Sequence, residues 1–296
     1  MKINVPTNKK IRLIINSDAK NEADDQFAIA HALLSEKFII KGIIAAHFGR
    51  ENSMIKSYEE CKLITKLVKR EGQFPIVRGS REKIKSETDF EYSDGAKLIV
   101  EEALKIDENP LYIIFLGAIT DMACALLKHP EIEDKVNVVW IGGGRYPYGS
   151  PEFNLGNDIL AANIVFSSKV NMWQIPSNAY KTMLASMSEL MIKVKPKGEL
   201  GKYLMEQMID FINDNINIKP WINTESWILG DSPAVGVLLE EQKGYYDMIE
   251  APYVREDFKY IYNGKNRCIR VYHTLNVRFI LEDLFAKLEL FALGEI

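Results

Sequence analysis

Three aspartates, Asp18, Asp24 and Asp25, lie within eight consecutive positions of the segment 11–34. Two roles are open for them. An aspartate near a helix N-terminus caps free N–H groups and meets the positive end of the helix dipole, which would account for Asp24 alone. Three carboxylates this close repel one another unless a cation or a proton lies among them. The spacing therefore also indicates a cation site.

The donor atoms decide which chemistry such a site would support. Oxygen ligands with no His or Cys nearby favour a hard cation, calcium or magnesium, over zinc. A cation held by aspartates lowers the pKa of a water molecule and orients it for attack, and an unsaturated carboxylate can take the proton. A fourth aspartate, Asp231, begins a helix in the segment GDSP much further along the chain. A plain helix cap is the alternative for that residue.

The elements that must position these residues alternate between apolar strands and helices. An apolar run at 11–15 precedes the aspartates, and a helical pattern follows them up to Leu34. This alternation predicts an open, mostly parallel sheet with helices on both faces. No repeat or linker interrupts the pattern, so we expect one domain over residues 1–296. Further strands are predicted at 38–48, 74–78, 111–116, 136–141, 171–175 and 267–273, an extended stretch at 245–262, a loop at 145–156, and helices at 53–70, 96–106, 121–128, 158–167, 184–215, from about 231, and at 277–290.

In such a sheet, ligands gather outside the carboxyl ends of the strands. Thr120 follows the strand 111–116, and Glu152 and Asn154 follow the strand 136–141. His47 ends the strand 38–48 on the same edge, where a functional and a structural role are equally open. Trp227 lies shortly before Asp231 and is a candidate to stack on a ligand, with packing as the alternative.

Five segments of the chain resemble, in order, the motifs of the nucleoside hydrolases of the inosine-uridine preferring type, which cleave the N-glycosidic bond of ribonucleosides. The resemblance spans roughly residues 10 to 240 and implies the Rossmann-like fold of that family, a homodimer or homotetramer, and a nucleoside or riboside as the small-molecule partner. The segments are Asp18…Asp24-Asp25, LGAITDMA at 116–123, WIGGG at 140–144, PEFNLGNDILAA at 151–162 and GDSP at 230–233.

Position by position, the resemblance implies a metal-dependent hydrolase with a metal-activated water and an aspartate general base. Asp18 would be that base and also touch the metal, which the family resemblance makes calcium, with magnesium as the alternative. The further ligands would be Asp25, Asp231 and the backbone carbonyl of Thr120. The substrate-binding residues are then expected to be Asp24, Asn52, Glu152, Asn154, His47 and Trp227.

The chain also departs from the family pattern. Asn16 stands where members usually have a second aspartate, and the acidic loop is about two residues longer than usual. Gly230 replaces the histidine that often precedes the distal aspartate and can protonate a leaving base, which resembles a divergent branch without that histidine. These departures keep an alternative open, in which the chain is a sugar- or glycoside-binding protein with a degenerate site.

Composition excludes several other classes. The formal net charge of −4 and an isoelectric point near 5.8 argue against a nucleic-acid binder. The three cysteines are far apart and form no CxxC pair, which favours reduced thiols in a cytoplasmic protein. We expect no membrane partner, because no apolar run approaches the ~18 residues of a membrane span.

Overall fold

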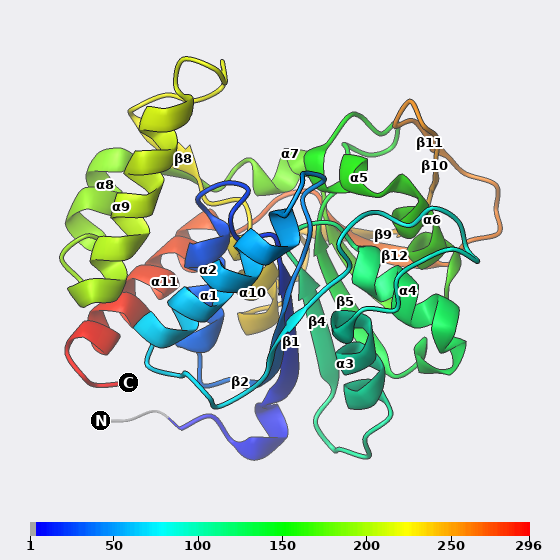
Figure 1. Ribbon diagram of the computed structural model, residues 1–296, viewed down its shortest axis with the longest axis horizontal. Helices are drawn as coiled ribbons and strands as arrows, with labels where there is room; N and C mark the ends of the chain where they lie inside the picture. The colour runs from blue at the N-terminus through cyan, green and yellow to red at the C-terminus, as the bar shows by residue number, and fades with distance from the viewer. Residues whose placement is uncertain (1–3) are drawn as a thin grey trace.

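An eight-stranded sheet runs through the centre of the computed structural model, which describes residues 4–296 (Figure 1). All neighbouring strands are parallel except the last pair, in which the edge strand β9 runs antiparallel to β12. The predicted open, mostly parallel sheet is therefore confirmed. The strands, in their order across the sheet, are β3 (Ile76–Arg78), β2 (Phe38–Ala45), β1 (Ile11–Ser17), β4 (Leu111–Phe115), β5 (Val136–Ile141), β6 (Asn171–Ile175), β12 (Cys268–Tyr272) and β9 (Tyr246–Glu250).

Strand β1 lies near the middle of the sheet, and every one of its residues is buried. Its one charged residue, Arg12, is accommodated by the helix end and the loop that precede β4. The guanidinium donates to the backbone carbonyls of Asn109 at 2.9 Å and Glu102 at 2.8 Å, and it lies 3.6 Å from the carboxylate of Asp107. These partners offset the cost of burying the charge, so the apolar run continues through it.

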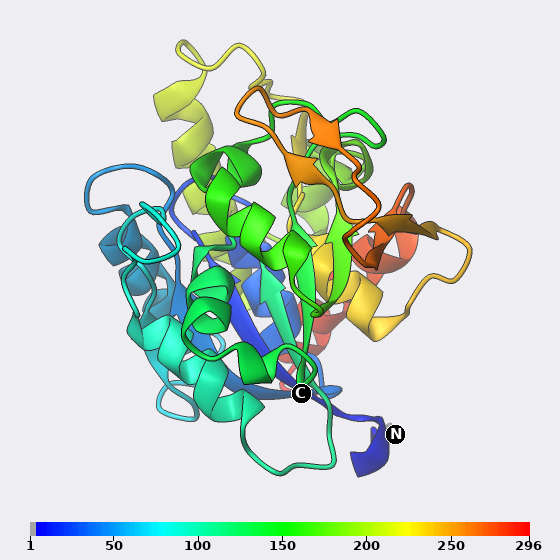
Figure 2. The same cartoon turned by 90° about the vertical axis from the view of Figure 1, so that its right-hand side faces the viewer.

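Helices cover both faces of the sheet, as predicted (Figures 1 and 2). Each face has its own apolar core, which contains side chains such as Phe27 and Leu284 on one side and Ile99 and Phe166 on the other. The first face carries α1 (Asp25–Leu33), α2 (Ser53–Leu67), α10 (Ser232–Leu239) and α11 (Val277–Ala292), and the second carries α3 (Asp94–Ala103), α4 (Thr120–Lys128) and α6 (Ile159–Ser167).

Two stretches differ from the sequence-based expectation. The segment 184–215 does not begin as a helix: β7 (Leu184–Ser186) pairs antiparallel with β8 (Ser226–Ile228) before α8 (Met187–Lys193) and α9 (Gly198–Asn215) follow. This pairing joins residues about 40 positions apart, which local periodicity cannot reveal. The segment expected as a loop at 145–156 runs into a short helix, α5 (Phe153–Asn157), because the Glu152 side chain caps its first turn.

The remaining elements are short. They are η1 (Thr7–Lys9), η2 (Pro130–Ile132), α7 (Ser177–Tyr180), β10 (Tyr253–Val254) and β11 (Tyr260–Ile261). Strands β10 and β11 form a hairpin, orange in Figure 2, that packs against α6 through β10. Among the helices that the structure describes, none has the length and apolar character needed to cross a membrane.

Candidate active site

Loops at the carboxyl ends of the parallel strands enclose a cavity of about 880 Å³. Its volume lies within the range of small-molecule binding sites, and its position is the one expected for a parallel sheet. The loop after β1, α5, α7 and the segment 221–231 all contribute to its wall. Of the residues predicted for the site, the cavity is lined by Asp18, Asp24, Asp25, Glu152, Asn154, Trp227 and Asp231.

Three carboxylates from two distant parts of the chain meet in this cavity. One oxygen from each of Asp24, Asp25 and Asp231 lies within 4.8 Å of the others. Asp24 and Asp231 occupy the N-cap positions of α1 and α10, but neither side chain makes a capping hydrogen bond to the described chain. The helix-cap alternative therefore does not explain either residue. The arrangement is suited to a cation with oxygen ligands.

The electrostatics of the acidic cluster also favour a bound cation. Burial raises the pKa of Asp18, Asp24 and Asp231 well above the ordinary value, and repulsion from Asp25 and other nearby carboxylates adds to the increase. Burial also raises the pKa of Asp25, to about 6, although the Ser17 hydroxyl donates a hydrogen bond to it at 2.5 Å. No lysine or arginine within residues 4–296 forms an ion pair with these four carboxylates. A bound cation would supply the missing positive charge.

Asp18 lies at the end of β1 and lines the same cavity. Its Oδ2 atom is buried and has no hydrogen-bond partner in the described part of the chain. Gly117 makes room for this carboxylate, since a Cβ atom at residue 117 would lie 2.4 Å from Asp18 Oδ1. A buried carboxylate oxygen without a partner is costly, so this atom also fits a role toward a cation or a water molecule.

The other side of the cavity carries Glu152 and Asn154. Glu152 accepts hydrogen bonds from the backbone N–H groups of Gly143 at 2.8 Å, Asn154 at 3.1 Å and Leu155 at 2.9 Å, and from the Tyr180 hydroxyl at 2.9 Å. The Asn154 side chain donates both N–H groups to the strand-end carbonyls of residues 116 and 141. These bonds fix the amide so that its oxygen is the end available to a ligand.

His47 and Thr120 lie beside the cavity but are not part of its lining. The Thr120 hydroxyl donates to Asp158 Oδ2 at 2.9 Å and lies 2.9 Å from His47 Nε2, so Nε2 must be the nitrogen that carries the proton. Burial lowers the pKa of His47, which keeps the ring neutral. Asn52 is exposed, occupies the N-cap position of α2 with a positive φ of 57° and no side-chain capping hydrogen bond to the described chain, and also lies outside the lining. None of these three placements brings the side chain to the cavity wall.

Trp227 lines the cavity with 4% of its surface exposed and packs edge-on against Phe211. Three further lining residues, Glu22, Asn157 and Tyr180, are not among those that the sequence predicts. Glu22 lies within the acidic loop and Asn157 within a family-like motif, so both had a weak local signal. Tyr180 lies in a segment without any recognisable motif.

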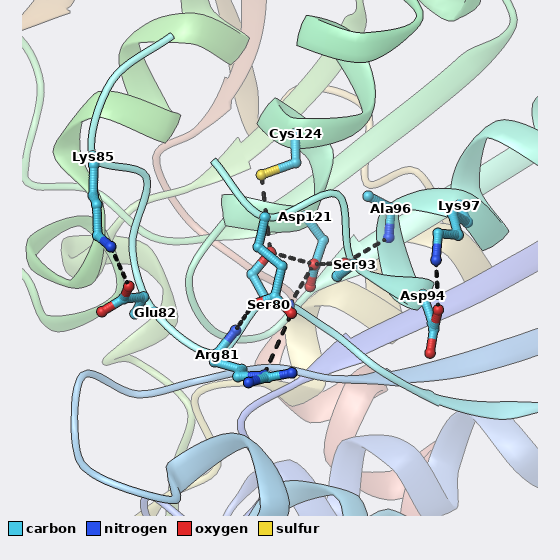
Figure 3. A network of polar contacts seen from close by, with 11 residues as sticks. Ser80, Arg81, Glu82, Lys85, Ser93, Asp94, Ala96, Lys97, Asp121 and Cys124 are labelled. Atoms are coloured by element: carbon cyan, nitrogen blue, oxygen red, sulfur yellow. Dashed lines mark hydrogen bonds and ion pairs between the residues drawn. The ribbon is translucent and has the colours of Figure 1, made fainter. Parts of the chain in front are cut away.

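A further buried carboxylate lies outside the cavity lining. Asp121 accepts hydrogen bonds from the backbone and hydroxyl of Ser80 at 2.8 and 3.0 Å and from the Ser93 hydroxyl at 2.7 Å (Figure 3). Its other oxygen accepts from Asn16 Nδ2 at 2.9 Å. Asn16, which stands where the resemblance implies a second aspartate, thus faces a carboxylate on α4.

Fold and site together define an α/β protein with a cation-compatible acidic pocket beside polar groups able to hold a sugar. Comparison with known families gives a more specific result. The model of the family "Inosine-uridine preferring nucleoside hydrolase" matches residues 13–277. The chain therefore belongs to the inosine-uridine preferring nucleoside hydrolase family.

Individual relatives agree with this assignment. An inosine-uridine preferring nucleoside hydrolase from Leishmania major is 29% identical over 119 residues, a match that spans 39% of this chain and only 38% of that relative. The structure of a purine-preferring ribonucleoside hydrolase from Gardnerella vaginalis superposes with a TM-score of 0.80 at 20% identity and covers 95% of this chain and 99% of its own. An inosine-uridine preferring nucleoside hydrolase from Bacillus anthracis gives 0.73 at 14% identity, with 94% and 99% covered. At these identities the two structures show a shared fold.

Proposed function

We propose that this protein is a metal-dependent hydrolase of the N-glycosidic bond of ribonucleosides or related ribosides. The observation that carries the proposal is the convergence of Asp24, Asp25 and Asp231 within 4.8 Å of one another, at the wall of a cavity that also presents Asn154. These three carboxylates and that of Asp18 form no ion pair with a lysine or arginine within residues 4–296, which supports a resident divalent cation. Calcium is the proposed ion, because it accepts many oxygen ligands in flexible geometry, with magnesium as the alternative.

The proposed ligands are Asp18, Asp25, Asp231 and the backbone carbonyl of Thr120. The position of Asp24 within the acidic cluster suits a further ligand as well as a contact to a ribose hydroxyl. When bound, the cation would lower the pKa of a water molecule and fix its orientation.

The protein's own groups account for the remaining steps. Asp18, whose Oδ2 has no hydrogen-bond partner among residues 4–296, accepts the proton from the attacking water. The surrounding carboxylates stabilise the positive charge that the sugar ring develops as the bond to the leaving group breaks. Asn154 presents its amide oxygen to a sugar hydroxyl, and Trp227 contributes an apolar wall for the leaving group.

A direct assay tests the proposal. The purified protein is incubated with a panel of purine and pyrimidine ribonucleosides, with calcium or with a chelator, and release of reducing sugar is measured. We expect turnover that depends on the added ion and that falls about a hundredfold to ten-thousandfold in Asp18→Asn, the range for one positioned general base. The matched control is Asp210→Asn, on the exposed side of α9, which should behave like the wild type. Equal activity in the Asp18 variant and the wild type would refute the assignment of the base.

A second candidate function is a sugar- or glycoside-binding protein with a degenerate site. Gly230 offers no side chain to protonate a leaving group, and the Glu152 oxygens are already occupied, which favours this alternative. Thermal-shift screening with ribose, nucleosides and oligosaccharides, followed by a reducing-sugar assay on each hit, separates the two. A ligand that raises the unfolding temperature and is recovered intact would support a binding protein.

We also propose that residues 1–296 act as one domain, since a single sheet holds an apolar core on each face. By its family, the chain is proposed to form a homodimer or homotetramer. Size-exclusion chromatography with light scattering measures the mass directly, and a mass near that of one 33.8 kDa chain would contradict the oligomer.

A further inference from the structure

Tyr180, the last residue of α7, lies between the acidic cluster and Glu152. At one end, its ring atom Cδ2 is 3.1 Å from the point that a Cβ atom of residue 230 would occupy, and that point is 3.3 Å from Asp24 Oδ2. At the other end, its hydroxyl donates to Glu152 Oε1 at 2.9 Å. The tyrosine therefore spans the cavity wall from the aspartates to the start of α5.

The hydrogen bonds of Glu152 determine what this wall offers to a ligand. A carboxylate has about four acceptor positions, and Glu152 uses four: three backbone N–H groups and the Tyr180 hydroxyl. Few acceptor sites remain on Glu152 for a sugar. The Tyr180 hydroxyl has only one proton, which it gives to Glu152, so its oxygen keeps its acceptor capacity for another group.

We propose that Tyr180 is a specificity-determining residue whose hydroxyl oxygen accepts a hydrogen bond from one hydroxyl group of the substrate's sugar. This inference rests on the proposed function, because it takes a riboside as the ligand. Glu152 acts through Tyr180 as a positioning residue: its acceptor bond orients the phenol, and the three backbone N–H groups hold the carboxylate in place. Asp24 and Asn154 remain as the contacts for the other hydroxyl groups.

The same geometry links Tyr180 to Gly230. Any side chain at residue 230 has to begin 3.1 Å from the Tyr180 ring and 3.3 Å from an Asp24 oxygen, both tighter than ordinary contact. A side chain at residue 230 would therefore require the tyrosine ring to shift by a few tenths of an ångström. The ring of Tyr180 thus occupies part of the space beside Gly230.

A substrate-truncation series tests the inference. The value of kcat/KM is measured for a ribonucleoside and for its 2′-, 3′- and 5′-deoxy forms, with the wild type and with Tyr180→Phe. In the wild type, removing the hydroxyl that faces Tyr180 should lower kcat/KM about tenfold, the usual range for one hydrogen bond. In Tyr180→Phe that one loss should shrink to within about twofold, while the losses for the other two deoxy forms stay as in the wild type. Equal losses for all three deoxy forms in both proteins would overturn the inference.

The chain offers a matched control in Tyr203, whose hydroxyl also donates to a glutamate, Glu60, at 2.7 Å but which lies outside the cavity lining. Tyr203→Phe should leave the whole deoxy series unchanged, and a change there equal to that of Tyr180→Phe would count against a direct contact. Tyr180→Leu, which also lacks the hydroxyl, repeats the test if the phenylalanine variant unfolds, as judged by circular dichroism.

The outcomes separate this inference from the proposed function. If the wild type hydrolyses no riboside, the proposed function fails, and the same series is then run as binding by calorimetry with the intact and deoxy ligands. A binding loss that disappears selectively in Tyr180→Phe supports the tyrosine contact, and one that persists unchanged refutes it. If the wild type turns over ribosides but the losses do not change in the variant, the inference alone is wrong.

Discussion

Gly117→Ala adds one methyl group, which should displace the carboxylate of Asp18, the proposed general base. A Cβ atom at residue 117 would lie 2.4 Å from Asp18 Oδ1 and 2.6 Å from its Cγ, about 1 Å inside ordinary van der Waals contact, which begins near 3.4 Å. The backbone of Gly117 has no positive φ, so the strain falls on the neighbouring carboxylate. Asp18 is 2% exposed and packed at the end of β1, which leaves it little room to move away.

The size of the effect follows from that overlap. A displacement of about 1 Å in a reacting group costs roughly a hundredfold in rate, so we expect kcat/KM to fall by about that factor. Inserting a methyl group into a packed site also costs about 1–3 kcal/mol of unfolding free energy. Steady-state kinetics with a ribonucleoside and urea unfolding followed by fluorescence measure the two effects separately.

Gly156→Ala is the matched control. Its added Cβ atom would meet only Phe258, at 3.4 Å, and the residue lies within the helix α5 without a positive φ. We expect kcat/KM to change far less than in Gly117→Ala, and the unfolding free energy to stay level or rise, because alanine favours a helix over glycine. If Gly117→Ala kept kcat/KM within twofold of the wild type, the close packing of Asp18 would not matter for activity and the reasoning would fail.

Three further predictions concern the charges of the site and the core. Asp121→Asn should lower the unfolding free energy in urea by about 1–3 kcal/mol, because it weakens the acceptor for two serines and Asn16. Adding Asn16→Asp should recover part of this loss. Strictly additive effects of the two substitutions would contradict an interaction between residues 16 and 121. Burial lowers the pKa of His31 from its ordinary 6.5, so protons bind the unfolded chain more readily and the unfolding free energy falls as the pH drops below about 6.5. His31→Gln should reduce the slope of unfolding free energy against pH between about pH 7 and 5, whereas His129→Gln, at a partly exposed position, should leave this slope unchanged. Equal slopes in the wild type and both variants would rule out His31 as the cause. Asp231→Asn should raise the thermal unfolding midpoint measured with a chelator, because repulsion within the acidic cluster is relieved. The same variant should show a smaller rise of the midpoint on addition of calcium than the wild type. A rise equal to that of the wild type would exclude Asp231 as a ligand.

The fold class and the acidic segment could be predicted from the amino-acid sequence, because both depend on local patterns. Apolar strands that alternate with helices require a covered parallel sheet, and the carboxyl ends of such strands meet at one edge. Asp18 and Asp25 could therefore be assigned to that edge from their place after the strand 11–15 alone. The assignment of Asp231 depended on the family resemblance, since its own segment is equally typical of a helix cap.

The three-dimensional arrangement of the chain was needed to establish which side chains face the cavity. It excluded the capping role of Asp231 and showed that the hydrogen-bonding capacity of Glu152 is used within the protein. It places His47 against Thr120, outside the cavity lining, and it brings Tyr180 into the cavity wall from a segment without a motif. These outcomes depend on hydrogen bonds and contacts between residues far apart in the chain. Periodicity and motif spacing describe neighbours in sequence, so they contain no information on how such distant groups share donors, acceptors and space.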